Sequence, residues 1–505
     1  MTRITAVILM LTGFIFFSCS NSSTKSGNDS EMNDEATDIA TDGNTDDLSD
    51  EVLTESEVDT ESEETNDSDT VESQQIQTGG IYIFSYMGGN DEKTLFDGKR
   101  VLGQGGFFGY SIFNLNEKYW AVGALHESIP PYDFEKATGR MYVFEKGQIP
   151  GNIGEAAFVL THPDLLYNAG FSFTAAGTCD INKDGFDDIA VSAHLATYGD
   201  AYAAGEIVVF YGTEDGWNEE NTSISRVSDG LIQKADSMSQ SLVCGDIDGD
   251  GFADVLAGGQ NAGPELSSGG SQGMVAFFKG SADGLGKNES WTLLPEVEEK
   301  AQYFGSSMIL EDINGDEIQD LIVSGWGLKE SGESDNTGGV YIYHGGTDWQ
   351  QGPSEKYFGI KDSQFGSVIR IVQVEGRKGL GVIATQEDIF GRIHFFGNMS
   401  SPFDVPDTLM SSDSGSFSDF LTVDGIDGYD TLVIAGGKYF FGGTGGLLCA
   451  GIGQDYAFKW EKCQWQPGDV SGGFGSSILN IGDINGDKRP EIVVGMPEYI
   501  HTVTD

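Results

Sequence analysis

Four acidic nonapeptides in this chain carry oxygen-bearing side chains at their first, third, fifth and ninth positions. They begin at Asp180, Asp246, Asp312 and Asp483, and each leads directly into an apolar run. Oxygens at this spacing can surround a hard cation, and Ca²⁺ takes six to eight oxygen ligands. The sequence therefore predicts about four calcium sites.

The regular spacing of these nonapeptides indicates a repeat architecture. The first three begin 66 residues apart, and the fourth begins 171 residues after the third, which is three periods of 57. Motifs on a fixed period of this size are typical of propellers and solenoids.

Two other interpretations of the nonapeptides compete with calcium binding. An EF-hand needs a bidentate Glu at position 12 and flanking helices, whereas position 12 here is Val191, Ala257, Val323 or Val494. The second alternative is a plain acidic turn that holds no ion. Four such loops in the same register before a strand disfavour it.

The elements that position the loops are strands, and they form seven units. Four units carry an acidic loop between a strand that starts with an aromatic or small residue and an apolar run. Three further units have the same two strand-like segments without the loop, and they begin at Phe108, Phe365 and Phe417. A second motif, Gly followed by alternating apolar and aromatic residues, also occurs seven times if the weaker copy at Gly445 is included. Alternation of this kind predicts a strand.

The order of the two motifs predicts how the ring closes. The first Gly-led strand, at Gly80, precedes the first Phe-led unit, and the last Phe-led unit, at Phe474, has no Gly-led strand after it. Joining the ends completes every unit if residues 80–86 supply the missing outer strand of the last blade. We therefore expect an all-β, seven-bladed β-propeller over residues 79–505.

These units resemble the FG-GAP repeat of integrin α-subunit propellers, in which Phe-Gly precedes D-x-[DN]-x-D-G-x-x-D. The resemblance implies calcium between two strands of a blade, on the face opposite the usual ligand face. The side-chain ligands that it implies are Asp180, Asn182, Asp184 and Asp188; Asp246, Asp248, Asp250 and Asp254; Asp312, Asn314, Asp316 and Asp320; and Asp483, Asn485, Asp487 and Glu491. The backbone carbonyls that it implies belong to Phe186, Phe252, Ile318 and Arg489.

The loops depart from the family pattern at position 6, which is Gly185 and Gly251 in the first two but Glu317 and Lys488 in the others. A left-handed turn there would cost a residue other than Gly roughly 1 kcal/mol. By carboxylate count and turn residue, the loop at Asp246 should bind calcium most tightly and the loop at Asp483 least tightly.

The N-terminal part predicts export. An apolar stretch from Ile4 to Phe17 ends at Ser18-Cys19, which resembles a bacterial lipobox. We expect a signal peptide over residues 1–18 and lipidation of Cys19, with anchoring to the bacterial cell envelope, at the outer membrane or cell surface. An ordinary secretory signal is the alternative.

Residues 19–78 are expected to form a disordered acidic tether. Residues 20–78 contain 19 acidic residues, one Lys and no aromatic residue, so they cannot bury enough apolar surface to fold. The formal net charge of the chain is −53, which argues against nucleic acid as a partner.

In an exported chain, cysteines can pair. Cys449 and Cys463 flank a predicted hairpin and are candidates for a disulfide, whereas Cys179 and Cys244 are either bridged or simply buried.

No catalytic constellation stands out. The G-x-S-x-G match at residues 269–273 lacks the strand-to-helix turn of a nucleophile elbow. His126 and His194 follow equivalent strands and are either a paired site or ordinary loop histidines.

We therefore expect a non-enzymatic, calcium-stabilised, surface-tethered monomer that binds an extracellular protein or glycan. The alternatives are an extracellular hydrolase or lyase and a structural subunit of an envelope complex. Candidate binding residues, which could equally pack between blades, are Phe107-Phe108, Phe171–Phe173, Trp326 and Tyr439-Phe440-Phe441.

Overall fold

A computed structural model describes most of the chain from residue 74 to residue 503. The gaps in this description are residues 78, 87–95, 129–136, 200, 229–230, 232–235, 265–271, 296–301, 330–336, 375, 386–390, 398–406, 412–415, 425–430, 438–444, 453–457, 466–472 and 499. The predicted signal peptide, Cys19, most of the acidic tether and Tyr439–Phe441 lie outside the described residues. Among the described residues, no helix has the length and apolar character that a membrane span requires.

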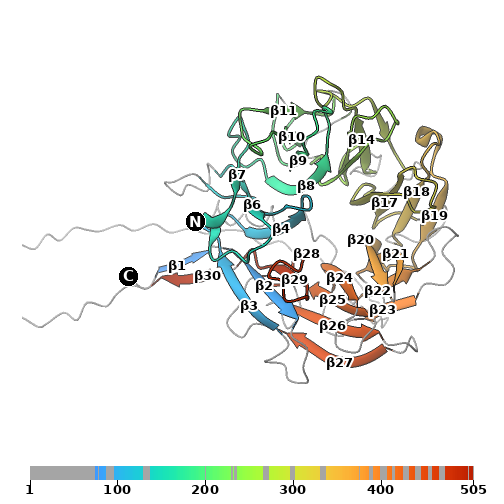
Figure 1. Ribbon diagram of the computed structural model, residues 1–505. Helices are drawn as coiled ribbons and strands as arrows, with labels where there is room; N and C mark the ends of the chain where they lie inside the picture. The colour runs from blue at the N-terminus through green and yellow to red at the C-terminus, as the bar shows by residue number, and fades with distance from the viewer. Residues whose placement is uncertain are drawn as a thin grey trace, which may run out of the picture. The chain divides into compact units, whose positions relative to one another are not determined.

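The described part beyond Thr70 is an all-β ring of seven four-stranded sheets (Figure 1). The seven blades confirm the fold predicted from the repeats. Within each blade the strands are antiparallel and run from the centre of the ring to its edge. The first, innermost strands are β4 (Phe108–Asn114), β8 (Phe171–Cys179), β12 (Ser241–Gly245), β16 (Ser307–Glu311), β20 (Phe365–Val374), β24 (Asp419–Asp424) and β28 (Ile478–Gly482).

The other three strands of each blade follow outward in order. The second strands are β5 (Tyr119–Ala124), β9 (Asp188–Ala193), β13 (Asp254–Gly259), β17 (Asp320–Gly325), β21 (Arg377–Ala384), β25 (Thr431–Gly437) and β29 (Glu491–Gly495). The third strands are β6 (Arg140–Glu145), β10 (Glu206–Phe210), β14 (Met274–Phe278), β18 (Gly339–Tyr343), β22 (Arg392–Phe396), β26 (Gly446–Ile452) and β2 (Gly80–Tyr86). The outer strands are β7 (Phe158–Leu160), β11 (Thr222–Ser225), β15 (Trp291–Leu293), β19 (Glu355–Phe358), β23 (Asp407–Ser411), β27 (Phe458–Trp465) and β3 (Phe96–Leu102). Two short 3-10 helices, η2 (Ile153–Glu155) and η3 (Trp349–Gln351), lie in the connections between the third and outer strands of the first and fourth blades.

The core is divided among the blade boundaries. Seven clusters of buried hydrophobic side chains occur in the described residues, each between two neighbouring blades. At the closing boundary, Ile83 and Val493 of the last blade pack with Phe108, Trp120 and Phe144 of the first. Because each blade buries its faces against its neighbours, the ring needs no single large core.

The two repeated sequence motifs meet at one structural junction. Gly79, which precedes the third strand of the last blade, forms a parallel bridge with Phe108, which opens the next blade. Gly109 has a φ of +88°, and a Cβ there would lie 2.0 Å from the Gly80 carbonyl oxygen. Only glycine permits this approach. The same bridge recurs between Gly273 and Phe304, between Gly338 and Phe365, and between Gly445 and Phe474.

Ring closure uses two strands from the N-terminal part, where the sequence predicted one. The last blade has the order β28-β29-β2-β3, and Figure 1 shows the blue strands β2 and β3 beside the red strands β28 and β29. The prediction that residues 80–86 complete this blade is correct, but its assignment of them as the outer strand is wrong, because β3 lies outside β2. A strand pair that the sequence did not predict joins β1 (Gln74–Gln77), within the predicted tether, to β30 (Ile500–Val503).

Candidate metal sites and binding face

All four nonapeptides connect the first strand of a blade to the second, as the resemblance implied. Their ninth residues, Asp188, Asp254, Asp320 and Glu491, each open a second strand and have no exposed surface. Each accepts a hydrogen bond from the backbone N–H at position 2 of its own loop, at 2.8–3.0 Å. In the first three loops a second N–H, from the Gly that follows the third strand, donates to the other oxygen. The position-9 carboxylate is therefore held in place from two strands.

Backbone donors also shape the exposed part of each loop. In the first loop the N–H groups of Asp184 and Gly185 donate to the two oxygens of Asp180, and the N–H of Phe186 donates to Asp184. The other three loops repeat the bond from position 6 to position 1 and the bond from position 7 to position 5. The carboxylates at positions 1 and 5 are thus bound to the backbone of the same turn in all four loops.

The predicted left-handed turn at position 6 is present in all four loops. The φ angles are +91° at Gly185 and +88° at Gly251, and they are +68° at Glu317 and +70° at Lys488. The two non-glycine residues adopt the conformation that the motif reserves for Gly, at a cost of about 1 kcal/mol each. The third and fourth loops keep the geometry of the first two despite this cost.

The donor set of these loops fits a hard cation such as calcium. Burial raises the pKa of Asp188 to about 6; its backbone donors oppose this shift, and the nearby Asp184 and Asp180 add to it. Burial likewise raises the pKa of Asp254 to about 6. A buried carboxylate beside other carboxylates is costly without a counter-charge, and a bound Ca²⁺ would supply that charge. In the second loop, oxygens of Asp246, Asp248 and Asp254 lie within 4.8 Å of one another.

The second loop contains a cation that sequence reasoning missed. The Lys279 ammonium contacts Asp248 and lies 2.7 Å from an Asp250 oxygen. The hydrogen bonds that Lys279 donates to Asp248 and Asp250 raise its pKa. Calcium would have to displace this ammonium, so carboxylate count alone overstates the affinity expected of this loop. The ranking of the four sites stays a prediction.

A signal for this neighbour exists in the sequence. Lys279 is the residue between the third strand β14 and the Gly that donates to position 9, and its counterparts are Tyr211 in the second blade and His344 in the fourth. His344 contacts Asp320 and Glu355 at 3.3 and 2.9 Å. The residue before this Gly therefore reaches its own blade's loop in the third and fourth blades.

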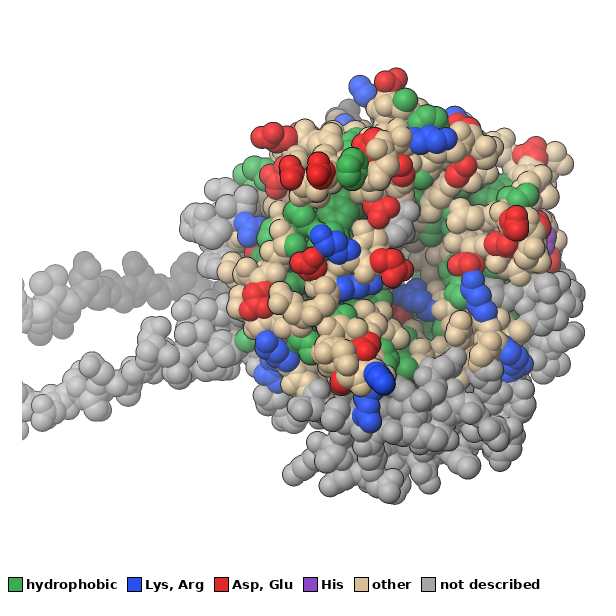
Figure 2. All heavy atoms as spheres, viewed as in Figure 1, with side chains coloured by type: hydrophobic (Ala, Val, Ile, Leu, Met, Phe, Trp, Pro, Cys, Tyr) green, Lys and Arg blue, Asp and Glu red, His purple; other side chains and the backbone are tan. Residues whose placement is uncertain are grey.

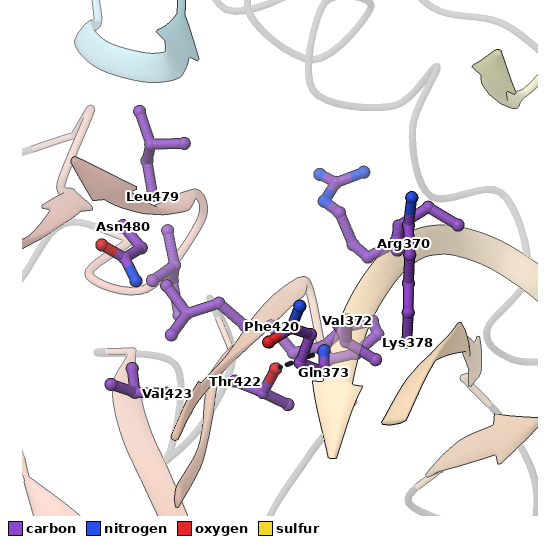
Figure 3. A pocket seen from close by; sticks show the side chains of 12 residues that line it. Arg370, Val372, Gln373, Lys378, Phe420, Thr422, Val423, Leu479 and Asn480 are labelled. Carbon is purple, nitrogen blue, oxygen red and sulfur yellow. Dashed lines mark hydrogen bonds between the residues drawn. The ribbon is translucent and has the colours of Figure 1, made fainter. Parts of the chain in front are cut away.

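A cavity of about 420 Å³ opens between the innermost strands of the fifth, sixth and seventh blades. Figure 3 shows the side chains of Arg370 and Lys378 extending in the same direction on one side of it, with Leu479 and Asn480 on another. Arg370 is paired with Asp419 at 3.0 Å, and Lys378 contacts Glu311. None of the lining residues is a carboxylate or a histidine, so this cavity contains no acid–base pair.

The opposite end of the blades, where first strands begin and second strands end, is aromatic. Tyr303 and Trp326 stack with ring centroids 3.5 Å apart and nearly parallel planes, and Trp326 Nε1 donates to Gln260 of the neighbouring blade. Both rings are half-buried. Phe107 and Phe173 flank the first residues of β4 and β8, Phe108 and Phe171. Phe107 and Phe173 are also half-buried, whereas Phe108 and Phe171 are fully buried at blade boundaries. Of the predicted aromatic candidates, Phe107, Phe173 and Trp326 therefore keep exposed surface. Figure 2 shows one face of the ring, hollowed near its middle, with basic and acidic side chains around the hollow.

His126 and His194 are packed into this aromatic end. Their rings contact Phe107 and Phe173, at centroid distances of 5.8 and 4.1 Å. Burial lowers the pKa of His126 to about 4. Burial also lowers the pKa of His194 to about 3, opposed by a hydrogen bond to the Gly170 carbonyl and aided by the nearby His126. Both imidazoles are therefore neutral at pH 7 and serve as packing groups.

These shifts predict that acid destabilises the fold through the two histidines. Their pKa values lie below the unfolded value of 6.5, so the unfolded chain binds protons first as the pH falls below 6.5. Between pH 7 and pH 5 in calcium-free buffer, the pair should lower the free energy of unfolding by on the order of 2–4 kcal/mol. Urea unfolding of the parent and of a His126→Gln, His194→Gln variant would separate this effect from carboxylate titration. An identical pH slope for both proteins would contradict it.

The structure decides between the alternatives left open for Cys179 and Cys244. They form a disulfide, with Cα atoms 6.2 Å apart, that joins the first strand of the second blade to that of the third. Cys449 is also disulfide-bonded, and the residue opposite it in the β26–β27 pair is Cys463.

Comparisons with known proteins agree with this geometry. The FG-GAP repeat family matches residues 163–210 and 239–278, which contain the first two loops with their flanking strands. The chain carries FG-GAP repeats. It is similar to integrin alpha-4 of Xenopus laevis, with 32% identity over 37% of this chain and 17% of that protein. It is also similar to integrin alpha-PS5 of Drosophila melanogaster, with 31% identity over 41% of this chain and 18% of that protein.

Two further similarities are more distant. A phosphatidylinositol-glycan-specific phospholipase D of Bos taurus is 24% identical over 32% of this chain and 20% of that enzyme. The solved structure of a periplasmic gluconolactonase of Pseudomonas aeruginosa aligns with a TM-score of 0.40 and 11% identity, over 78% of this chain and 96% of that one. The region shared with these curated relatives spans 17–20% of their length.

Proposed function

We propose that this FG-GAP propeller is a calcium-stabilised binding module that recognises an extracellular protein or glycan and has no catalytic activity. The proposal rests on the chemical difference between the two ends of the blades. One end carries four carboxylate loops whose position-9 residues are buried. The other end exposes part of the stacked Tyr303–Trp326 pair. Aromatic faces with a nearby polar group provide large contact area at low entropic cost, for sugar rings and for side chains alike.

Calcium in this proposal has a structural role. The ligands would be the residues at positions 1, 3, 5 and 9 of each loop, with the carbonyl at position 7. A bound ion would join the first and second strands of its blade and neutralise the converging carboxylates. Because the loops and the aromatic residues lie at opposite ends of the blades, we propose that calcium stiffens the ring without contacting the ligand.

We also propose that the propeller is monomeric, exported and held at the bacterial cell envelope through Cys19 and the acidic segment. Support for this part comes from the sequence alone: the lipobox-like Ser18-Cys19 and the charge of residues 20–78. An acidic, self-repelling chain would extend and carry the propeller away from a membrane surface.

The hydrolase alternative has one observation in its favour, the similarity to a phospholipase D. The described histidine–carboxylate pairs do not support it. His162 contacts Glu206 at 2.5 Å, but both side chains are fully buried, and Glu206 is also bound by Arg226. His344 is bound to two carboxylates beside the third calcium loop. Each pair fits a structural role.

Glycan and matrix-protein arrays, probed with the full chain in calcium and in chelator, would test the proposal. A Trp326→Ala variant should lose at least tenfold in affinity for any ligand found, and its calcium-dependent melting should be unchanged. A matched Trp291→Ala variant, altered in an outer strand, should keep the affinity. A ligand that both variants bind equally would place recognition elsewhere, and turnover of an arrayed glycan would favour the hydrolase.

A further inference from the structure

The first two calcium loops are physically joined in a way that the others are not. Three separate contacts cross the boundary between the second and third blades at this point. They are a disulfide, a backbone hydrogen bond and a cation–π contact. We propose that loops 180–188 and 246–254 bind calcium as a coupled pair, in which the first ion raises the affinity for the second. This inference rests on the proposed function, because it requires both loops to bind calcium.

The backbone hydrogen bond connects ligand groups of the two sites. The N–H of Ala253 in the second loop donates to the carbonyl of Asp180 in the first, at 3.1 Å. The peptide unit that contains the Ala253 N–H also contains the Phe252 carbonyl, which is the backbone ligand assigned to the second site. A planar peptide fixes one group when the other is fixed. Holding Asp180 therefore orients the Phe252 carbonyl.

A second hydrogen bond links the Asp180 peptide unit to the first site. The peptide that supplies the Asp180 carbonyl also supplies the Ile181 N–H, which donates to the position-9 carboxylate of Asp188 at 2.8 Å. An ion held by Asp180 and Asp188 would thus fix the peptide unit whose carbonyl accepts the hydrogen bond from Ala253 of the second loop. The ordering cost met by the first ion need not be met again by the second, which is the condition for positive coupling.

The disulfide keeps the two loops in register. Cys179 directly precedes Asp180, and Cys244 stands two residues before Asp246, so the bridge joins the two strand ends from which the loops emerge. Lys183 adds a third contact, since its ammonium lies over the Phe252 ring, 5.3 Å from the centroid. Between the second and third loops, which are fully described, no backbone hydrogen bond is present, and no cysteine precedes the third loop.

Calcium calorimetry on full chains that retain two loops would measure the coupling. One variant, Asp316→Ala with Asp487→Ala, keeps the first and second loops. The matched control, Asp184→Ala with Asp487→Ala, keeps the second and third, which also lie in adjacent blades. The first protein should show positive cooperativity, with a coupling factor of about tenfold, and the control should show independent sites.

Removing the bridge should abolish the coupling. Adding Cys179→Ser and Cys244→Ser to the first protein should make its two sites independent and weaker, whereas Cys449→Ser with Cys463→Ser should leave the coupling intact. Independent sites in the first protein, or equal coupling in the control, would overturn the inference, and neither result requires the disulfide variant to fold. If calcium binds to neither two-loop protein nor to the parent chain, the proposed function fails instead.

Discussion

Deleting residues 19–88 should open the ring and remove most of the stability of the propeller. The deletion removes β2, and β3 pairs only with β2 within its sheet, so the last blade would keep two strands of four. Ile81, Ile83 and Phe84, which the deletion removes, and Val101, which loses its strand partner, have no exposed surface, so the core loses four buried side chains. At roughly 1.5–3 kcal/mol for each buried side chain, the loss is about 6–12 kcal/mol, comparable to the whole stability of a typical domain.

A shorter deletion is the matched control for this experiment. Deleting residues 19–78 removes β1 and its pairing with β30 but no strand of any blade, so the melting temperature should fall only slightly. The longer deletion should give aggregates or dimers by size-exclusion chromatography, because β29 then presents an unpaired edge. Adding a peptide of residues 74–105 in trans should restore a monomeric, cooperatively melting protein. Equal stability of the two truncations would show that the last blade closes without β2.

The fold could be predicted from the sequence because several blade boundaries demand the same residues. A junction in which Phe108 bridges to Gly79 needs two glycines with positive φ, and similar bridges recur around the ring, so the motif is visible in the sequence. The outer strand β3 was missed because outer strands have no such requirement. Its sequence, FDGKRVL, includes exposed Gly98 and Lys99 and carries no repeated pattern.

The candidate calcium ligands could be predicted for a related reason. In each loop they lie within nine consecutive residues, so their spacing along the sequence identifies most of the site. The sequence did not predict the contacts that residues outside the nonapeptides make with the loops. Lys279 lies 31 residues from Asp248, and the two cysteines of the bridge are 65 residues apart. Contacts of this kind depend on how neighbouring strands and blades stack, and the nine-residue loop pattern does not contain them.

The seven-bladed frame also changes how the isolated histidines are interpreted. Because His126 and His194 follow the equivalent strands β5 and β9, a paired site was one interpretation of the sequence. The structure brings both imidazoles to the aromatic end of neighbouring blades but buries them against Phe107 and Phe173. The equivalence of the two strands therefore placed both histidines at the same end of neighbouring blades, whereas their protonation state depends on burial, which only the packed blades reveal.

Removing calcium should lower the free energy of unfolding by about 5–6 kcal/mol relative to a calcium concentration tenfold above Kd, since each of four sites contributes about 1.4 kcal/mol. The physical reason is that buried Asp188, Asp254, Asp320 and Glu491 would lose their counter-charge beside other carboxylates. Denaturant unfolding in calcium and in chelator, at matched ionic strength so that screening stays constant, would measure the difference.

A variant with Asp184→Ala, Asp250→Ala, Asp316→Ala and Asp487→Ala is the control for the effect of calcium. These exposed position-5 residues can be replaced without opening a cavity, so the variant should fold and its stability should be insensitive to chelator. Mg²⁺ should restore less of the parent's stability than Ca²⁺, because it demands near-ideal octahedral geometry and gives up its water reluctantly. A parent protein whose unfolding is indifferent to chelator would show that the converging carboxylates are satisfied by backbone donors and by cations such as Lys279 alone, and the loops would then be structural turns.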